Sequence, residues 1–182
     1  MNHVNQSLVD LLMEEHSGQR SELIAMLAFE NPEVCEELVL LTFSNEEPLS
    51  RRAAWPLRKL YDHHPEKIIP YIDYFVLQLR DLKSESVLRT ILSILSRCTI
   101  PEEHHGVMLE FCEAKILNAN TSIASVANCI DIYYAIASGE PDLLRELDLM
   151  FEIIRPTASA GVRSKMGIIH RKINKLSIRK QY

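Results

Sequence analysis

A period of about 36 residues runs through most of this 182-residue chain and restricts its fold more than any other feature. Four prolines each open an apolar, helix-patterned segment, at spacings of 33, 36 and 40 residues: Pro32, Pro65, Pro101 and Pro141. An aromatic residue stands ten places after three of them, at Phe75, Phe111 and Phe151. A fixed period in this range is typical of stacked two-helix units. The spacing therefore predicts an all-α chain, an α-solenoid of antiparallel helix pairs.

The second helix of each pair is marked by a small residue at its start. We place these helices at 50–63, 86–98, 122–137 and 161–176, where they begin at Ser50, Ser86, Ser122 and Gly161. Such residues suit the cap position before a first helical turn. The first helices run from the prolines to about residues 44, 82, 118 and 155, with Asn31 and His64 as candidate caps. Pro56 predicts a kink or a late start in the helix at 50–63.

We expect one domain over residues 1–182, with an N-terminal helix pair in 1–30, about four two-helix repeats in 31–176 and a basic tail in 177–182. Ser7 and Asp10 form a capping-box pattern, and Ser17-Gly18 predicts the end of the first helix. The chain shows no secretory signal and no apolar run long enough for a bilayer, so we expect a cytoplasmic protein. Without a CxxC pair, we interpret its four cysteines as reduced core thiols, namely Cys35, Cys98, Cys112 and Cys129.

Short motifs near the starts of the second helices resemble those of HEAT or armadillo-type repeats. These motifs are Leu-Ser-Arg-Arg at 49–52, Val-Leu-Arg at 87–89 and Val-Arg at 162–163. Pro70 resembles the proline that these repeats often carry inside a first helix. The resemblance covers about residues 31–176, and it implies a right-handed superhelix with the second helices on its concave side. The third repeat departs from the pattern, because Ser125 stands where Arg89 stands in the second.

Polar residues spaced by three and four predict one open face along the second helices. In a stack of this kind the faces would align into a groove for a protein or peptide partner, and arginine offers forked donors to carboxylates. The other interpretation is the ordinary solvated side of amphipathic helices. The candidate groove residues are Arg52, Lys59, Arg89, Ser93, Arg97, Ser125, Asn128 and Asp131.

The net charge of −5 is unevenly distributed along the chain. Residues 153–182 hold eight basic and no acidic residues, whereas residues 1–152 hold 12 basic and 25 acidic ones. The candidate residues of this basic end are Arg171, Lys172, Lys175 and Arg179. They predict either a solvated helix face, an anion- or acid-binding surface, or weak head-to-tail self-association with the acidic residues 30–37.

Nothing in the sequence indicates a catalytic residue, a metal site or a cofactor. Two histidine pairs, His63-His64 and His104-His105, lie at helix starts, where adjacent side chains point about 100° apart and chelate poorly. We therefore favour a non-catalytic scaffold that binds a protein or peptide partner along its groove. Binding of nucleic acid or another anion through the basic end is the alternative, although the negative charge and the single tryptophan argue against nucleic acid. An enzyme with a helical active site is disfavoured, and no membrane association is expected.

Overall fold

The computed structural model describes residues 7–179, with side chains up to Lys175, and every regular element in that range is helical. The chain divides into two compact units, Met1–Ile94 (unit 1) and Leu95–Tyr182 (unit 2). Each unit buries apolar side chains of its own. The all-helical fold class is confirmed, and the single domain expected over the whole chain stays a prediction.

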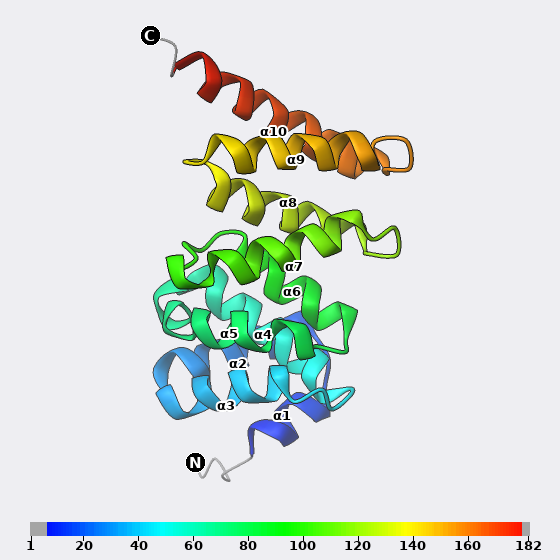
Figure 1. The fold of residues 1–182 in the computed structure, drawn as a ribbon. Helices are drawn as coiled ribbons and strands as arrows, with labels where there is room; N and C mark the ends of the chain where they lie inside the picture. The colour runs from blue at the N-terminus through cyan, green and yellow to red at the C-terminus, as the bar shows by residue number, and fades with distance from the viewer. Residues whose placement is uncertain (1–6, 180–182) are drawn as a thin grey trace. The chain divides into compact units, whose positions relative to one another are not determined.

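Unit 1 begins with three successive helices that pack on a fourth (Figure 1). These are α1 (Leu8–Glu14), α2 (Gly18–Glu30), α3 (Pro32–Phe43) and α4 (Leu49–His63). Both α2 and α3 pack along α4, and α1 contacts the same helix. In the repeat scheme α1 and α3 are first helices, and α2 and α4 are second helices. The helix pair expected in residues 1–30 is therefore a repeat like those that follow it.

The first helix expected at 65–82 is broken into shorter pieces. It consists of η1 (Pro65–Lys67), η2 (Ile69–Tyr71), α5 (Ile72–Gln78) and η3 (Leu79–Asp81), and α6 (Glu85–Leu95) follows. Pro70 lies in η2, where its missing N–H and its steric effect on Ile69 oppose an α-helix. In contrast, α4 runs from Leu49 to His63 through Pro56, so the late start considered for that helix is not observed.

In the described part of unit 2, four α-helices follow one another, and each runs in roughly the opposite direction to the one before it (Figure 1). They are α7 (His105–Leu117), preceded by η4 (Glu102–His104), then α8 (Ile123–Ala137), α9 (Pro141–Ile154) and α10 (Ala160–Arg179). The first helices α7 and α9 pack on the second helix α8, and α10 also packs along α8. The second helices α8 and α10 are thus neighbours within this unit.

The three aromatic residues that mark the period lie at equivalent buried positions of the first helices. The exposed fraction is 0% for Phe75, 8% for Phe111 and 1% for Phe151. In unit 1 the Phe75 ring packs against Phe43, with 5.1 Å between the ring centroids. The sequence register of the first helices is therefore confirmed.

The register of the second helices differs from the prediction between α6 and α8. Six consecutive core positions of α6, from Val87 to Leu95, recur 38 residues later in α8, from Ser125 to Tyr133. The serine spacing used for the prediction was 36, because Ser86 lies inside α6 whereas Ser122 is the cap before α8. Ser125 is consequently equivalent to the core residue Val87 and not to Arg89.

Local capping follows the sequence at three helix starts and departs from it elsewhere. Two residues expected at helix starts lie inside their helices, namely Ser50 in α4, whose N-cap is Pro48, and Gly161 in α10. Side-chain oxygens of Ser7, Asn31 and Ser122 accept hydrogen bonds from the backbone at the starts of α1, α3 and α8. Ser17, expected with Gly18 at the end of the first helix, instead caps the start of α2. His64 makes no capping hydrogen bond, because its ring stacks on Phe29 at 3.8 Å between centroids.

Candidate interaction surface

Polar side chains on the second helices connect each of these helices to the next within a unit. In unit 1, Lys59 Nζ donates to Glu22 Oε1 at 2.7 Å, and Arg58 Nη1 donates to Ser93 Oγ at 2.6 Å. In unit 2, Lys165 Nζ donates to Asp131 Oδ2 at 2.6 Å. The partners are separated by 37, 35 and 34 residues, close to the repeat period. We call these three contacts the inter-repeat rungs.

Two of the predicted groove residues in unit 1 hold the N-terminal helices in place. Arg52 Nη1 donates to the carbonyl oxygens of Leu12 at 3.1 Å and Met13 at 2.7 Å, near the end of α1. Carbonyls in the last turn of a helix lack intrahelical donors and carry partial negative charge, which suits an arginine. Since Lys59 forms a rung with α2, this part of the predicted groove is occupied by the chain itself.

Glu22 on α2 is held by two residues of α4. Besides Lys59, His63 lies near it, with Nε2 3.4 Å from Glu22 Oε2. The hydrogen bond from Lys59 is the main reason that the pKa of the Glu22 carboxyl is lower than usual. The site shows that a second-helix face of this chain binds a carboxylate with basic side chains.

The candidates on and after α6 lie in different settings. Arg89 is exposed on α6. Ser93, one turn further on, accepts the hydrogen bond from Arg58 that forms one of the inter-repeat rungs. Arg97 lies beyond the end of α6 at Leu95, in a turn that belongs to unit 2. Arg89 and Ser93 therefore share one helix face, whereas a face shared by all eight candidates stays a prediction.

The outer face of α8 combines small and polar side chains. Ser125, expected on this face, is fully buried, and its Oγ accepts a hydrogen bond from Ser122 Oγ at 2.9 Å. The expectation of an exposed Ser125 is wrong for the register reason given above. The residues that do reach this surface are Ala124, Ala127, Asn128, Asp131, Tyr134 and Ala135.

Beside this face, α10 carries a row of basic side chains. Lys165, Ile168, Lys172 and Lys175 follow one another at intervals of three or four residues and form one stripe of the helix, which we call the α10 stripe. Lys165 contacts Asp131 of α8, and Lys172 Nζ lies 5.3 Å from the centre of the Tyr134 ring. The stripe thus borders the outer face of α8.

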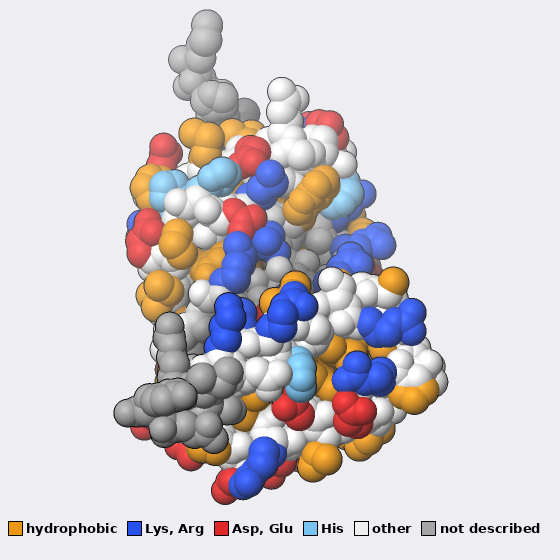
Figure 2. Space-filling view, turned by 90° about the horizontal axis from the view of Figure 1, so that it is seen from above, with side chains coloured by type: hydrophobic (Ala, Val, Ile, Leu, Met, Phe, Trp, Pro, Cys, Tyr) orange, Lys and Arg blue, Asp and Glu red, His pale blue; other side chains and the backbone are white. Residues whose placement is uncertain are grey.

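The predicted basic end is only partly on this stripe. Lys172 and Lys175 belong to it, Arg171 is exposed on another side of α10, and the side chain of Arg179 lies outside the described residues. Figure 2 views the structure from above and shows several Lys and Arg side chains on the surface seen from that direction.

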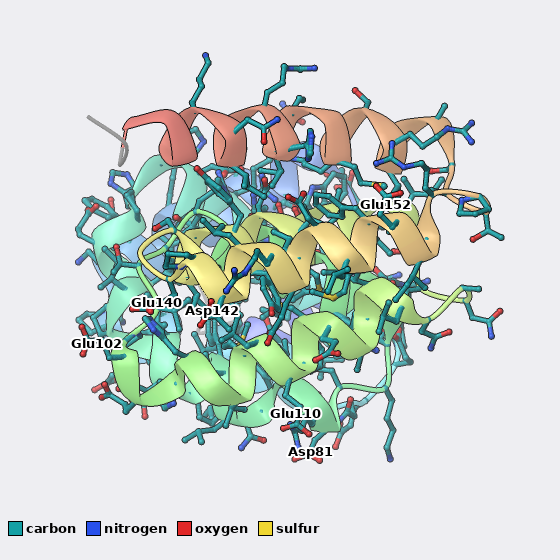
Figure 3. All side chains as sticks on the ribbon, turned by 45° about the horizontal axis from the view of Figure 1, so that its top comes forward. Asp81, Glu102, Glu110, Glu140, Asp142 and Glu152 are labelled. Carbon is teal, nitrogen blue, oxygen red and sulfur yellow. The ribbon has the colours of Figure 1, made fainter. Side chains whose placement is uncertain are left out.

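Charge is segregated between the two kinds of helix in unit 2. The first helices α7 and α9, with η4, carry eight acidic and two basic residues, whereas α8 and α10 carry one acidic and six basic residues. Figure 3 shows Glu102, Glu110, Asp142 and Glu152 on the first-helix elements. The one acidic residue of α8 and α10 is Asp131, which Lys165 already pairs. The residue counts alone would have predicted this segregation of charge if the helix boundaries had been known.

The other reactive side chains are engaged in local contacts. A cavity of about 280 Å³ in unit 2 is lined by Cys98, Glu102 and His105 together with apolar residues. His105 Nε2 lies 3.0 Å from the Ile100 carbonyl oxygen, so the backbone occupies that nitrogen. Among the described residues, no group of three or more His, Cys, Asp or Glu side chains could hold a metal ion.

The cysteines follow the expected pattern of core thiols in three of four cases. Cys35, Cys112 and Cys129 are buried, Cys98 is partly exposed, and none of the four forms a disulfide bond. A hydrogen bond to Cys129, together with burial, raises the pKa of Cys112 well above its ordinary value. A thiol held in this way is a poor nucleophile, since the thiolate is the reactive form.

Comparison with known proteins agrees with the helical pairs described above. The family model of the HEAT repeat domain matches residues 8–173. No curated protein and no solved structure gives a match. Within the described range, no helix combines the length and apolar character needed to cross a bilayer.

Proposed function

The chain belongs to the HEAT repeat domain family, and from this premise we propose that it is a non-catalytic scaffold that binds a protein or peptide partner along the face of its second helices. HEAT repeats commonly mediate protein interactions. The observation that carries the proposal is the outer face of α8 and the adjoining α10 stripe in unit 2.

The shape of the α8 face suits an extended or helical segment. Ala124, Ala127 and Ala135 have short side chains, so a partner can approach the helix closely along this line. Asn128 and Asp131, both half-buried, stand between these alanines and offer hydrogen-bonding groups. A face with small residues and a few placed polar groups supports recognition of a chain better than it supports catalysis, which needs convergent reactive groups.

In unit 1 the corresponding residues support assembly more than recognition. Arg52 and Lys59 hold α1 and α2, as described above, which leaves Arg89 as the exposed candidate on α6. We therefore place the binding surface on unit 2.

Site-specific photocrosslinking tests the proposal. A photoreactive phenylalanine analogue replaces Ala124 on α8 or, as the matched control, Ala114 on α7, both exposed alanines of unit 2. In extract from the source cell, the Ala124 variant is expected to crosslink to discrete proteins, and excess unmodified protein should suppress the products. Equal crosslinking from Ala114, or products from Ala114 alone, would contradict the proposed surface.

A further inference from the structure

We propose that the segment which unit 2 binds is acidic, and that Lys172 and Lys175 of the α10 stripe pair with its carboxylates. This inference rests on the proposed function, and it adds the chemistry of the partner. Three observations carry it: the charge segregation, the unpaired lysines and the exposed apolar residue one turn before them.

The first observation is that, among the helices of unit 2, basic residues are concentrated on the second helices. Six basic residues stand on α8 and α10, opposed there only by Asp131. The acidic residues of the same unit stand mainly on α7, α9 and η4. Complementary charge steers the encounter of two proteins and fixes their orientation, so a second-helix face of this composition selects acidic partners.

The second observation is that the lysines further along the stripe have no carboxylate. Lys165 is paired with Asp131, whereas Lys172 contacts the Tyr134 ring and Lys175 forms no ion pair with any described residue. In unit 1, by contrast, basic side chains of a second helix do have a carboxylate partner, because Lys59 and His63 both contact Glu22. A carboxylate from outside would give Lys172 and Lys175 the partner that Glu22 provides in unit 1.

The third observation is Ile168, which is 42% exposed between Lys165 and Lys172. At about 1.5 Å rise per residue, the stripe from Lys165 to Lys175 extends about 15 Å. An extended chain of five residues covers that length at about 3.3 Å per residue. The geometry thus fits a short segment with an apolar residue against Ile168 and acidic residues on the side that faces Lys172 and Lys175.

A protein segment fits this surface better than a nucleic acid does. The basic surface is limited to one helix and its border, and residues 1–152 carry 25 acidic against 12 basic residues. A duplex presents a charge every 1.7 Å, so it would also meet this acidic surface. A short acidic segment can contact the stripe alone.

Fluorescence anisotropy on the full chain tests the inference with a labelled peptide in which two glutamates stand on one side of a leucine, and a peptide with glutamine at the same positions. The K172E/K175E variant is compared with K115E/R145E, which changes two exposed or half-exposed basic residues of α7 and α9 and alters the net charge equally. We expect saturable binding of the glutamate peptide alone, about tenfold weaker in K172E/K175E and nearly unchanged in K115E/R145E. Thermal unfolding of both variants shows that each still folds.

Other outcomes overturn the inference. Equal losses in the two double variants would show that only net charge matters. A labelled DNA duplex that binds more tightly than the peptide, and whose binding K172E/K175E abolishes, would assign the stripe to nucleic acid. If K172E/K175E leaves the crosslinks from Ala124 unchanged, the partner is not held by these lysines, although the proposed scaffold function stands.

Discussion

In unit 1, the second helices α2, α4 and α6 carry six basic and four acidic residues, whereas in unit 2 α8 and α10 carry six basic and one acidic residue. The first helices of both units are acidic, so the arrangement of charge is the same. The use of the basic side chains differs. Arg20, Arg51, Arg58 and Lys59 all form ion pairs within unit 1, and Arg52 binds the carbonyls of α1.

In unit 2 most of the basic side chains on α10 point to the surface without such partners. Lys165 is paired, while Arg163, Arg171 and Lys175 form no ion pair with the described residues. The difference teaches that basic side chains on the second helices hold neighbouring repeats together where an acidic residue is near. Where no acidic residue is near, the same kind of side chain remains available to bind a partner. The following substitutions separate what the units share from what distinguishes them.

The largest effect should be the same in both units. Phe75→Ala in unit 1 and Phe151→Ala in unit 2 each remove a fully buried ring and leave a cavity. Each is expected to lower the free energy of unfolding by about 3–5 kcal/mol, measured by urea denaturation. Leu149→Ala, at a residue that is 64% exposed, serves as the control and should change stability by less than about 0.5 kcal/mol. A loss below about 1 kcal/mol at either phenylalanine would show that the two positions are not equivalent.

A smaller effect should distinguish the units. Arg52→Ala removes two charged hydrogen bonds to the end of α1 and is expected to cost about 1–2 kcal/mol in urea denaturation. Lys172→Ala removes an exposed side chain whose ammonium group lies over the Tyr134 ring and should cost less than about 0.5 kcal/mol. Equal losses of stability in the two variants would mean that the basic residues of α4 and α10 contribute to folding in the same way. That result would contradict the difference drawn between the two units.

The sequence was sufficient for the helix pairs because the period depends on local rules. Proline at a helix start, buried aromatics and the caps at Ser7, Asn31 and Ser122 are all determined by residues within one turn. The sequence was insufficient where a serine can serve either as a cap or as a core residue. Ser86 and Ser122 look alike in the chain, yet one lies inside α6 and the other precedes α8, and the resulting shift misplaced Ser125.

The candidate surface could be predicted only in part. Asn128, Asp131 and Arg89 reach the surface as helical spacing predicts. The partners of Arg52 and Lys59 could not be predicted, because they depend on how α1 and α2 pack on α4, and packing is not a local property. Pro70 was expected inside an α-helix, but the strain it imposes on Ile69 produces 3₁₀ turns instead.

Two buried serines near the starts of second helices offer a finer comparison. Ser125 in unit 2 accepts a hydrogen bond from Ser122, whereas Ser50 Oγ in unit 1 has no hydrogen-bonding partner among the described residues. Ser125→Ala is expected to cost about 1 kcal/mol, and Ser50→Ala should leave stability unchanged or raise it, because it removes an unsatisfied buried hydroxyl. Differential scanning calorimetry of the two variants measures both effects. A clear loss in Ser50→Ala would indicate a bond or a packing role that the structure does not show.

The smallest effect should appear as a pH dependence in unit 1. The pKa of Glu22 is lowered in the folded chain, chiefly by the hydrogen bond from Lys59, so its ionised form stabilises the fold. That stabilisation is present above the ordinary carboxyl pKa of 4.5 and is lost as the pH falls through the lowered value. Glu22→Gln should therefore be less stable than the wild type near neutral pH, by less than about 1 kcal/mol for this partly exposed pair.

The stability difference between Glu22→Gln and the wild type should close as the solution becomes more acidic than the carboxyl range. The same comparison in a Lys59→Gln background provides the control, because the main cause of the lowered pKa is then absent. Chemical denaturation at a series of pH values measures both pairs. A difference that is independent of pH would show that Glu22 contributes through packing and not through its charge.

The inter-repeat rungs also bear on how a chain of this kind changes over evolution. Each rung joins residues 34–37 positions apart, so one repeat supplies the donor and its neighbour supplies the acceptor. Duplication or loss of a segment one period long preserves the spacing between the joined positions, so that each of them again faces its counterpart in the neighbouring repeat. An insertion of two residues within a second helix turns its later positions by about 200° and carries the donor to the opposite side. Natural length variation among descendants of such a chain should therefore occur in whole repeats or within the connecting loops.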